Sequence, residues 1–136
     1  MSAYAGVDQF NALVGAPLDR GKTPVGGASL ATGTTYNMDA TVGGEDLLNV
    51  MADLSGAGAA GDVTVQVFPY GPDGVTLLTT PLPAVSGVGF AGTLNGGHAC
   101  LSQQYAVQGI DRVQIQVKNN NAATKTVNAS WRTENN

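Results

Sequence analysis

Residues 111–133 read Asp111-Arg-Val-Gln-Ile-Gln-Val-Lys-Asn-Asn-Asn-Ala-Ala-Thr-Lys-Thr-Val-Asn-Ala-Ser-Trp-Arg-Thr133, two alternating segments joined by a polar loop. The apolar positions of the two segments are Val113, Ile115, Val117, Val127, Ala129 and Trp131. Since successive side chains of a strand point to opposite faces, both segments predict strands with one dry and one wet face. We expect them to form an antiparallel β-hairpin that packs on one side only, as the strands of a β-sandwich do.

The rest of the chain from Thr34 onward also consists of strand-length pieces between turn signals. The strands expected before the closing pair are residues 34–42, 47–54, 62–70, 75–80, 85–94 and 99–107. The apolar positions of 47–54 fit a helix or a strand, and the glycines that follow favour the strand. The pattern predicts an all-β fold with a single antiparallel β-sandwich of about eight strands. Periodicity does not separate a jelly-roll from an immunoglobulin-like strand order.

Residues 1–33 differ from the rest and predict an extended N-terminal arm, which leaves residues 34–136 as the β-sandwich domain. Gly and Pro punctuate this arm, and it holds one short apolar group with the i, i+3, i+4 spacing of a helical turn. The arm residues expected to contact a neighbouring chain are Tyr4, Phe10, Leu13 and Val14. The open alternative is that this turn caps the domain's own sandwich.

The composition indicates one domain that carries little charge. A chain of 136 residues can bury enough surface to fold without metal or disulfide support. Charged residues make up 12% of it, about half the usual share. The net charge of −4 includes no basic cluster that could neutralise phosphates, so we expect no nucleic-acid partner. Such a weakly charged surface indicates cover by neighbouring chains in the working state, and therefore assembly.

No motif indicates a metal site or a nucleophilic triad. The single His98 and the single Cys100 are too few for a metal site, and no Gly-x-Ser-x-Gly elbow surrounds a serine. His98 follows two glycines and is expected in a solvated loop. Cys100 lies in an alternating segment and is expected to be a small buried hydrophobe.

The acidic residues also favour structural interpretations. Glu45 and Asp46 are adjacent, so their side chains point apart, and we expect both to be solvated charges in a loop. Asp73 lies in the turn sequence Gly71-Pro-Asp-Gly74 and lacks the six to eight oxygen ligands of a calcium site. We therefore expect a protein that is not an enzyme, with no catalytic residues, no cofactor and no metal.

Aromatic residues and the N-terminus bear on partners and location. Trp131 falls on the apolar face of its strand and is expected in the core, whereas Tyr36, Tyr70 and Tyr105 remain possible surface platforms for a sugar.

The N-terminus lacks the charged and apolar regions of a signal peptide, and no run approaches 18 apolar residues. We expect no membrane partner and a protein made and kept in a cytoplasm.

The chain resembles a capsid decoration protein of tailed bacteriophages, also called a cement or auxiliary protein, or a related small virion structural protein. The resemblance rests on the Gly- and Pro-punctuated arm, on the compact β-domain rich in Ala, Gly, Val and Thr, and on the closing run at residues 111–132. It covers residues 34–133 in general character, and the closing run is its most telling part.

The resemblance implies a jelly-roll or related sandwich, often trimeric, that sits where major capsid subunits meet and clamps them together. It therefore implies a non-enzymatic virion protein on the outer surface of a phage capsid, made in the host cytoplasm. The implied partners are the major capsid protein and further copies of the chain in a homotrimer. The alternative is a carbohydrate- or receptor-binding β-sandwich module of a phage particle, which would show exposed, convergent aromatic residues.

Overall fold

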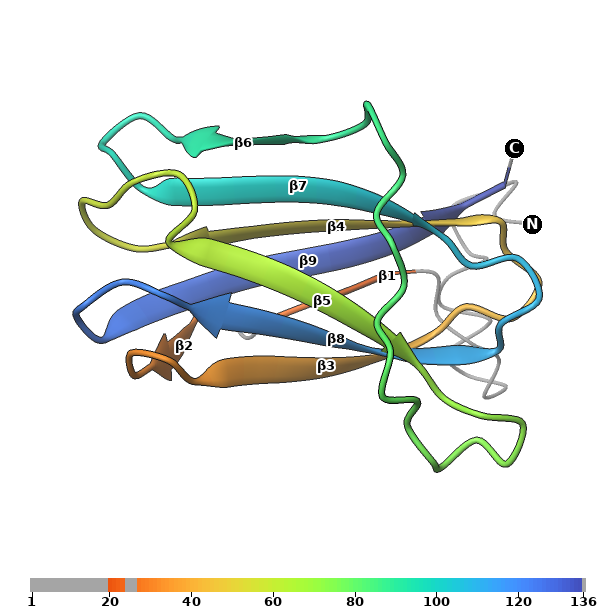
Figure 1. The fold of residues 1–136 in the computed structure, drawn as a ribbon. Helices are drawn as coiled ribbons and strands as arrows, with labels where there is room; N and C mark the ends of the chain where they lie inside the picture. The colour runs from red at the N-terminus through yellow and green to blue at the C-terminus, as the bar shows by residue number, and fades with distance from the viewer. Residues whose placement is uncertain (1–19, 24–26, 136) are drawn as a thin grey trace, which may run out of the picture.

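The computed structural model of the protein describes residues 20–23 and 27–135 (Figure 1). Within this part of the chain the regular structure is all β-strand, which confirms the all-β prediction. The strands are β1 (Arg20–Lys22), β2 (Ala28–Leu30), β3 (Thr35–Thr41), β4 (Leu47–Leu54), β5 (Val63–Pro69), β6 (Phe90–Thr93), β7 (Ala99–Ala106), β8 (Arg112–Asn119) and β9 (Lys125–Glu134). Each pairing between these strands is antiparallel.

The strands form two sheets that pack face to face as a sandwich (Figure 1). The larger sheet has the order β1-β9-β4-β7-β6, and β2 also pairs with β9; the smaller sheet has the order β3-β8-β5. Along the chain, β2 to β5 lie alternately in the larger and the smaller sheet, and so do β7 to β9. An immunoglobulin-like sandwich places several consecutive strands in one sheet. The alternation observed here differs from that order.

The closing segments form strands, but they do not form a hairpin. β8 pairs with β3 and β5 in the smaller sheet, whereas β9 pairs with β4, β1 and β2 in the larger sheet. The hairpin prediction is therefore wrong. The assignment of faces is confirmed, because the apolar side chains of both strands are buried between the sheets. Alternation specifies which face of a strand is apolar. It does not specify whether two strands pair within one sheet or oppose each other across the core between two sheets.

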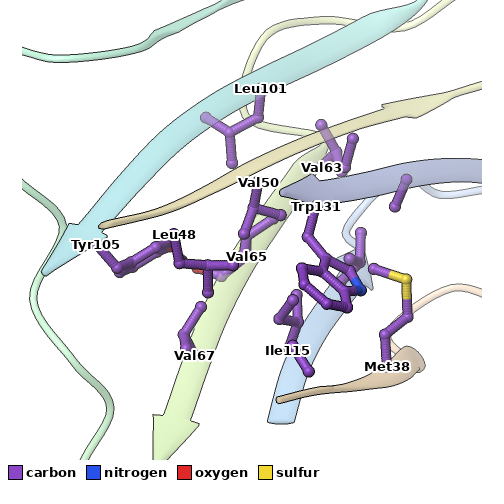
Figure 2. Close-up of a cluster of buried hydrophobic side chains, with 14 of the residues drawn as sticks. Met38, Leu48, Val50, Val63, Val65, Val67, Leu101, Tyr105, Ile115 and Trp131 are labelled. Carbon is purple, nitrogen blue, oxygen red and sulfur yellow. Dashed lines mark hydrogen bonds between the residues drawn. The ribbon is translucent and has the colours of Figure 1, made fainter. Parts of the chain in front are cut away.

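The core between the sheets consists mainly of Val, Leu and Ala side chains, which suits the small-residue composition (Figure 2). Val63, Val65 and Val67 of β5 point inward, as their alternation predicts. Trp131 is 7% exposed and belongs to this core, so its predicted core position is confirmed. Figure 2 shows the Trp131 ring pointing toward Met38 and Ile115, which come from the opposite sheet.

The described part of the N-terminal segment lies along the larger sheet. β1 and β2 fall within residues 1–33, and both pair with the edge of β9 that β4 leaves free. Between them, Thr23 is buried, its backbone N–H donates to the Ala129 carbonyl at 2.9 Å, and its Oγ1 accepts from the Ala129 N–H at 3.1 Å. Some residues of the expected arm are therefore part of the sheet. Tyr4, Phe10, Leu13 and Val14 lie outside the described residues.

Residues 71–89 connect β5 to β6 and differ most from the sequence expectation. The strand expected at 75–80 is reduced to an isolated bridge between Tyr70 and Leu77, and the one expected at 85–94 is the shorter β6. This crossing segment runs from the smaller sheet to the larger one (Figure 1). The Leu82 N–H donates to Val67 of β5 at 2.8 Å, and the Val85 N–H donates to Gln104 of β7 at 2.7 Å. It thus supplies hydrogen bonds to the edge strand β5 of the smaller sheet and to the part of β7 that β6 leaves unpaired.

Candidate functional site

The outer faces of the two sheets, those turned away from the core, differ in chemistry. On the smaller sheet, the central row across β3, β8 and β5 is Asn37, Gln116 and Gln66. On the larger sheet, the central row from β1 to β6 is Lys22, Ser130, Met51, Ser102 and Phe90. The first row is entirely polar amide, and the second carries two large apolar side chains separated by a serine. The larger sheet is therefore the better candidate for a surface that docks on another apolar surface.

Met51 lies at the centre of a hollow in this face. The hollow has a volume of about 730 Å³, and Met51 itself is 43% exposed. The neighbours of Met51 in the same row, Ser130 and Ser102, are small and also line the hollow. An exposed methionine between serines is an adaptable contact point, because its unbranched side chain can adjust to an irregular partner.

A second hollow adjoins the first one. It measures about 380 Å³ and is lined by residues 87–91 and by β7 residues 101–103. Ser102 lines both hollows, so the two are neighbours along the row. Phe90 and Val88 at this end are 51% and 46% exposed. The apolar surface thus extends from the middle of the sheet to its β6 edge.

Gly89 lets the chain lie close against β7 at this edge. Its φ is +94°, and a Cβ added there would approach the Ser102 carbonyl carbon to 3.0 Å and Gln103 Cα to 3.2 Å. This close backbone neighbour explains why the position is a glycine.

Charged and hydrogen-bonded side chains lie at one end of the apolar part of the face. Lys22 and Arg132 line the first hollow on its β1 side. Next to it, the Asn49 amide donates to Glu134 Oε1 at 2.7 Å, and the Gln104 amide donates to Asn49 Oδ1 at 3.0 Å. These hydrogen bonds hold the side chains of Asn49, Gln104 and Glu134 in place, so the polar end of the face has a defined geometry.

The residues that the sequence analysis considered for catalysis or metal binding lie apart from this face or are engaged in turns. His98 is half-buried, and its carbonyl accepts from the Leu94 N–H at 2.7 Å to close the turn at 95–97. Cys100 is buried, which confirms that prediction, and burial, with a smaller contribution from Asp53, raises the pKa of its thiol. In residues 20–23 and 27–135, no three His, Cys, Asp or Glu side chains gather as metal ligands would.

The acidic residues stabilise connections. The Glu45 N–H donates to the Val42 carbonyl at 3.1 Å in the β3–β4 connection, and the Asp46 carbonyl accepts from the Val107 N–H at 2.9 Å. Asp73 accepts from the Thr76 hydroxyl and from the N–H groups of Thr76 and Val75. These bonds lower the pKa of Asp73 to about 2, with the Thr76 hydroxyl as the largest cause. The predicted turn at 71–74 is confirmed by the bond from Gly74 N–H to Gly71 O at 2.9 Å.

The three tyrosines considered as sugar platforms have other partners. Tyr105 is 2% exposed and belongs to the core, so the platform interpretation is wrong for this residue. Tyr36 is half-buried and packs against the core. The Tyr70 hydroxyl donates to Asp39 at 2.8 Å, and the Arg112 guanidinium lies 4.3 Å from the centre of its ring. One face of Tyr70 is therefore occupied by a cation.

The sequence analysis did not identify Met51 and Phe90 as site residues, although the strand pattern held a signal. In 47–54, the even-numbered apolar positions alternate into the core, and Met51 is an additional apolar residue at an odd-numbered position. A large apolar side chain on the wet face of a half-buried strand indicates a contact surface. Phe90 carried less signal, because its strand is short and its burial pattern does not alternate clearly.

Comparisons with known proteins give no relative: no family model matches the chain, and no curated protein matches it. Across the described residues, no helix has the length and apolar character needed to cross a bilayer.

Proposed function

We propose that the protein is a non-enzymatic structural protein of a virion that docks the outer face of its larger sheet on neighbouring protein subunits. In this proposal it is a capsid decoration protein, the neighbours are major capsid subunits, and the protein stabilises the contacts between them on the outer surface of a phage capsid. The observation that carries the proposal is the row of exposed apolar side chains on the larger sheet, which the smaller sheet lacks. The virion setting comes from the sequence resemblance.

The composition of this face supports a protein partner. Protein interfaces have a centre enriched in Met and aromatic residues and depleted of charge, and a polar rim. Met51 and Phe90 supply such a centre here, and Lys22 and Arg132 lie at one end. A clamp works because it shares surface with several subunits, so that separating any two of them also breaks the contacts of the clamp.

The β-sandwich by itself supports both candidate functions, because sandwiches of the jelly-roll type occur in viral capsid proteins and in lectins. The choice therefore depends on the surface. A sugar-binding module presents exposed, convergent aromatic rings, and among the described residues Phe90 is the aromatic side chain with the greatest exposure. The apolar row thus favours a protein partner over the carbohydrate- or receptor-binding alternative.

The direct test is attachment to capsids that lack the protein. Purified protein is mixed with such capsids at micromolar concentration, and the number of bound copies and the temperature of capsid rupture are measured. We expect saturable binding and a higher rupture temperature. Light scattering on the free and bound protein gives the oligomeric state, which we expect to be a homotrimer. Absence of binding would exclude the decoration function, and hits on a glycan array would then support the alternative.

Variants connect attachment to the proposed face. Met51→Asp and Phe90→Asp place a charge in the apolar row, and we expect each to weaken attachment roughly tenfold or more, as loss of a central contact does. Gln66→Asp places the same charge on the outer face of the smaller sheet and is the matched control. Equal attachment of all three variants, with unfolding midpoints unchanged, would show that another surface makes the contact.

A further inference from the structure

Charge is distributed unevenly over the molecule. Of the ten acidic and six basic residues of the chain, all but Asp73 lie outside residues 63–110. The stretch 63–110 supplies β5, the crossing segment, β6 and β7. β5 contacts β7 across the core, and the crossing segment joins β5 to β6, so these elements form one side of the sandwich (Figure 1). That side is almost free of charge.

The same side carries most of the exposed apolar side chains. Among the described residues, six large apolar side chains are exposed, and one of them is Met51. The other five all lie within residues 74–94, and they are Val75, Leu78, Val88, Phe90 and Leu94. We call residues 74–94 the side wall. Charge returns at its first residue, where the Arg112 guanidinium donates to the Gly74 carbonyl at 2.8 Å.

The side wall has a fixed shape before any partner binds. The backbone N–H groups of Leu82 and Val85 donate to strands β5 and β7 at 2.8 and 2.7 Å. Pro81 and Pro83 restrict the backbone on either side of Leu82, because the proline ring locks φ. An ordered surface loses little conformational freedom in a contact, which lowers the cost of association.

We propose that the side wall is the surface through which copies of this chain bind one another. The inference rests on the proposed function for the homo-oligomer, and it adds the surface that forms it. Copies of a chain with a net charge of −4 repel each other, and they repel least through a part that carries no charge. Where the same patch lies on both sides of a contact, any charge in it also meets its own sign. A charge-free wall therefore fits a second copy.

The side wall is large enough for such a contact. It has 21 residues, and none of them is buried. Stable protein interfaces take about 20 to 30 residues from each partner. They combine an apolar centre with a polar rim, and here Asp73 and Arg112 supply charge at one end of the apolar wall.

The first experiment measures self-association of the purified protein by sedimentation equilibrium over a range of concentrations, without capsids. We expect Leu78→Asp and Thr80→Asp each to weaken association about tenfold or more, because both place a charge in the side wall. Thr80 is exposed and polar, so its variant keeps the apolar side chains and tests the wall even if Leu78→Asp unfolds. Gln66→Asp adds the same charge to the outer face of the smaller sheet and should associate as the parent does.

Salt provides an independent measurement on the parent protein. Salt screens the repulsion between the copies and breaks no ion pair in an uncharged contact, so we expect association to stay equal or become tighter as salt is added. Association that weakens with salt would assign the contact to the charged part of the surface and overturn the inference.

The second experiment follows amide hydrogen exchange by mass spectrometry as the protein is concentrated. We expect peptides from residues 74–94 to exchange more slowly, and peptides from β3 on the opposite side to stay unchanged. Protection confined to another region, or a parent protein that is monomeric throughout, would contradict the inference.

The outcomes for the side wall and for the capsid are separate. A monomer that attaches to capsids would overturn the inference and leave the decoration function in place. Copies that assemble through the side wall but do not attach would support the inference and exclude the decoration function.

Discussion

Gly21 shows how one small residue supports both the edge of the sheet and the core. It pairs with Trp131 across β1 and β9, and a Cβ added to it would approach Trp131 Cε2 to 2.8 Å and Nε1 even more closely. The indole is held in the core, so it has little room to move. We predict that Gly21→Ala lowers the free energy of unfolding by about 1 to 3 kcal/mol, the usual effect of overpacking.

Urea unfolding of this variant is compared with that of Gly92→Ala. Gly92 also lies in an edge strand of the larger sheet, but an added Cβ there meets no atom within 4 Å. We expect Gly92→Ala to change stability by less than about 0.5 kcal/mol. Equal effects of the two substitutions would show that the approach to Trp131 does not require glycine.

Tyr105 gives a prediction for alkaline pH. Burial raises the pKa of its hydroxyl from 10.0 to about 12. The unfolded chain therefore ionises first, so the stability that the neutral phenol contributes is complete below pH 10 and is lost as the pH rises toward 12. We predict that the stability advantage of the parent protein over Tyr105→Phe decreases across this window, as measured by urea midpoints. Parallel pH profiles of the two proteins would contradict this.

The positions of single residues were predictable wherever a long strand alternates. Trp131 was placed correctly because it lies within a run whose apolar positions determine the faces. Cys100 is buried as expected, but it shares the phase of the outward Ser102, so the alternation rule does not account for its burial. Tyr105 could have been placed by the same rule, since it shares its parity with the buried Leu101 and Val107. The polar hydroxyl suggested exposure, but the ring is large and apolar and the phase of the strand prevails.

At the scale of elements, Asn119 controls how β8 leads into β9. It is fully buried, its amide donates to the Leu30 carbonyl at 2.9 Å and to the Ala123 carbonyl at 3.0 Å, and its Oδ1 accepts from the Asn121 N–H at 2.8 Å. These bonds join the loop to the end of β2 and carry the chain from one sheet to the other. The connection is therefore an arch between sheets.

We predict that Asn119→Ala lowers stability by about 1 to 3 kcal/mol, because the buried Leu30 carbonyl and the part-buried Ala123 carbonyl and Asn121 N–H all lose the side chain they bond to. Asn120→Ala is the control, since its amide donates to the exposed Thr64 hydroxyl at 3.0 Å, and we expect a change below about 0.5 kcal/mol. Unfolding midpoints in urea measure both. A small effect of Asn119→Ala would mean that the arch is held by strand pairing alone.

The arch also explains which elements the sequence could predict. Strands with steady alternation, such as β3, β5 and β8, follow from the local pattern because period two is a property of the strand itself. The partner of a strand depends on side chains far away along the chain. Asn119 lies within a run of three asparagines, and nothing in that run distinguishes an arch from a turn.

At the scale of the whole molecule, the sandwich was predictable and its contact face was not. Many strands with one dry face must stack in two layers, whatever their order. The candidate face requires the strand order, because Met51 and Phe90 are far apart in the chain and come together only through the pairing of β4, β7 and β6. A surface that several strands build in common has no signature in any one of them.

The same order of strands determines where the N-terminal segment can be removed. A cut after residue 19 keeps β1, whereas a cut after residue 25 removes β1 and the Thr23 bonds to Ala129 and uncovers the edge of β9 beside Trp131. We predict that the protein lacking residues 1–19 unfolds cooperatively with nearly the parent midpoint, and that the protein lacking residues 1–25 is less stable by about 1 to 3 kcal/mol.

Urea unfolding followed by tryptophan fluorescence measures both deletions, since Trp131 is the single tryptophan and lies under β1. Loss of attachment or of trimer formation in the shorter deletion then reports on the segment itself, because the sandwich is intact. If both deletions have the same midpoint, β1 contributes nothing to stability and the dispensable N-terminal segment extends to residue 25. If the shorter deletion still attaches and assembles as the parent does, the N-terminal segment takes no part in assembly.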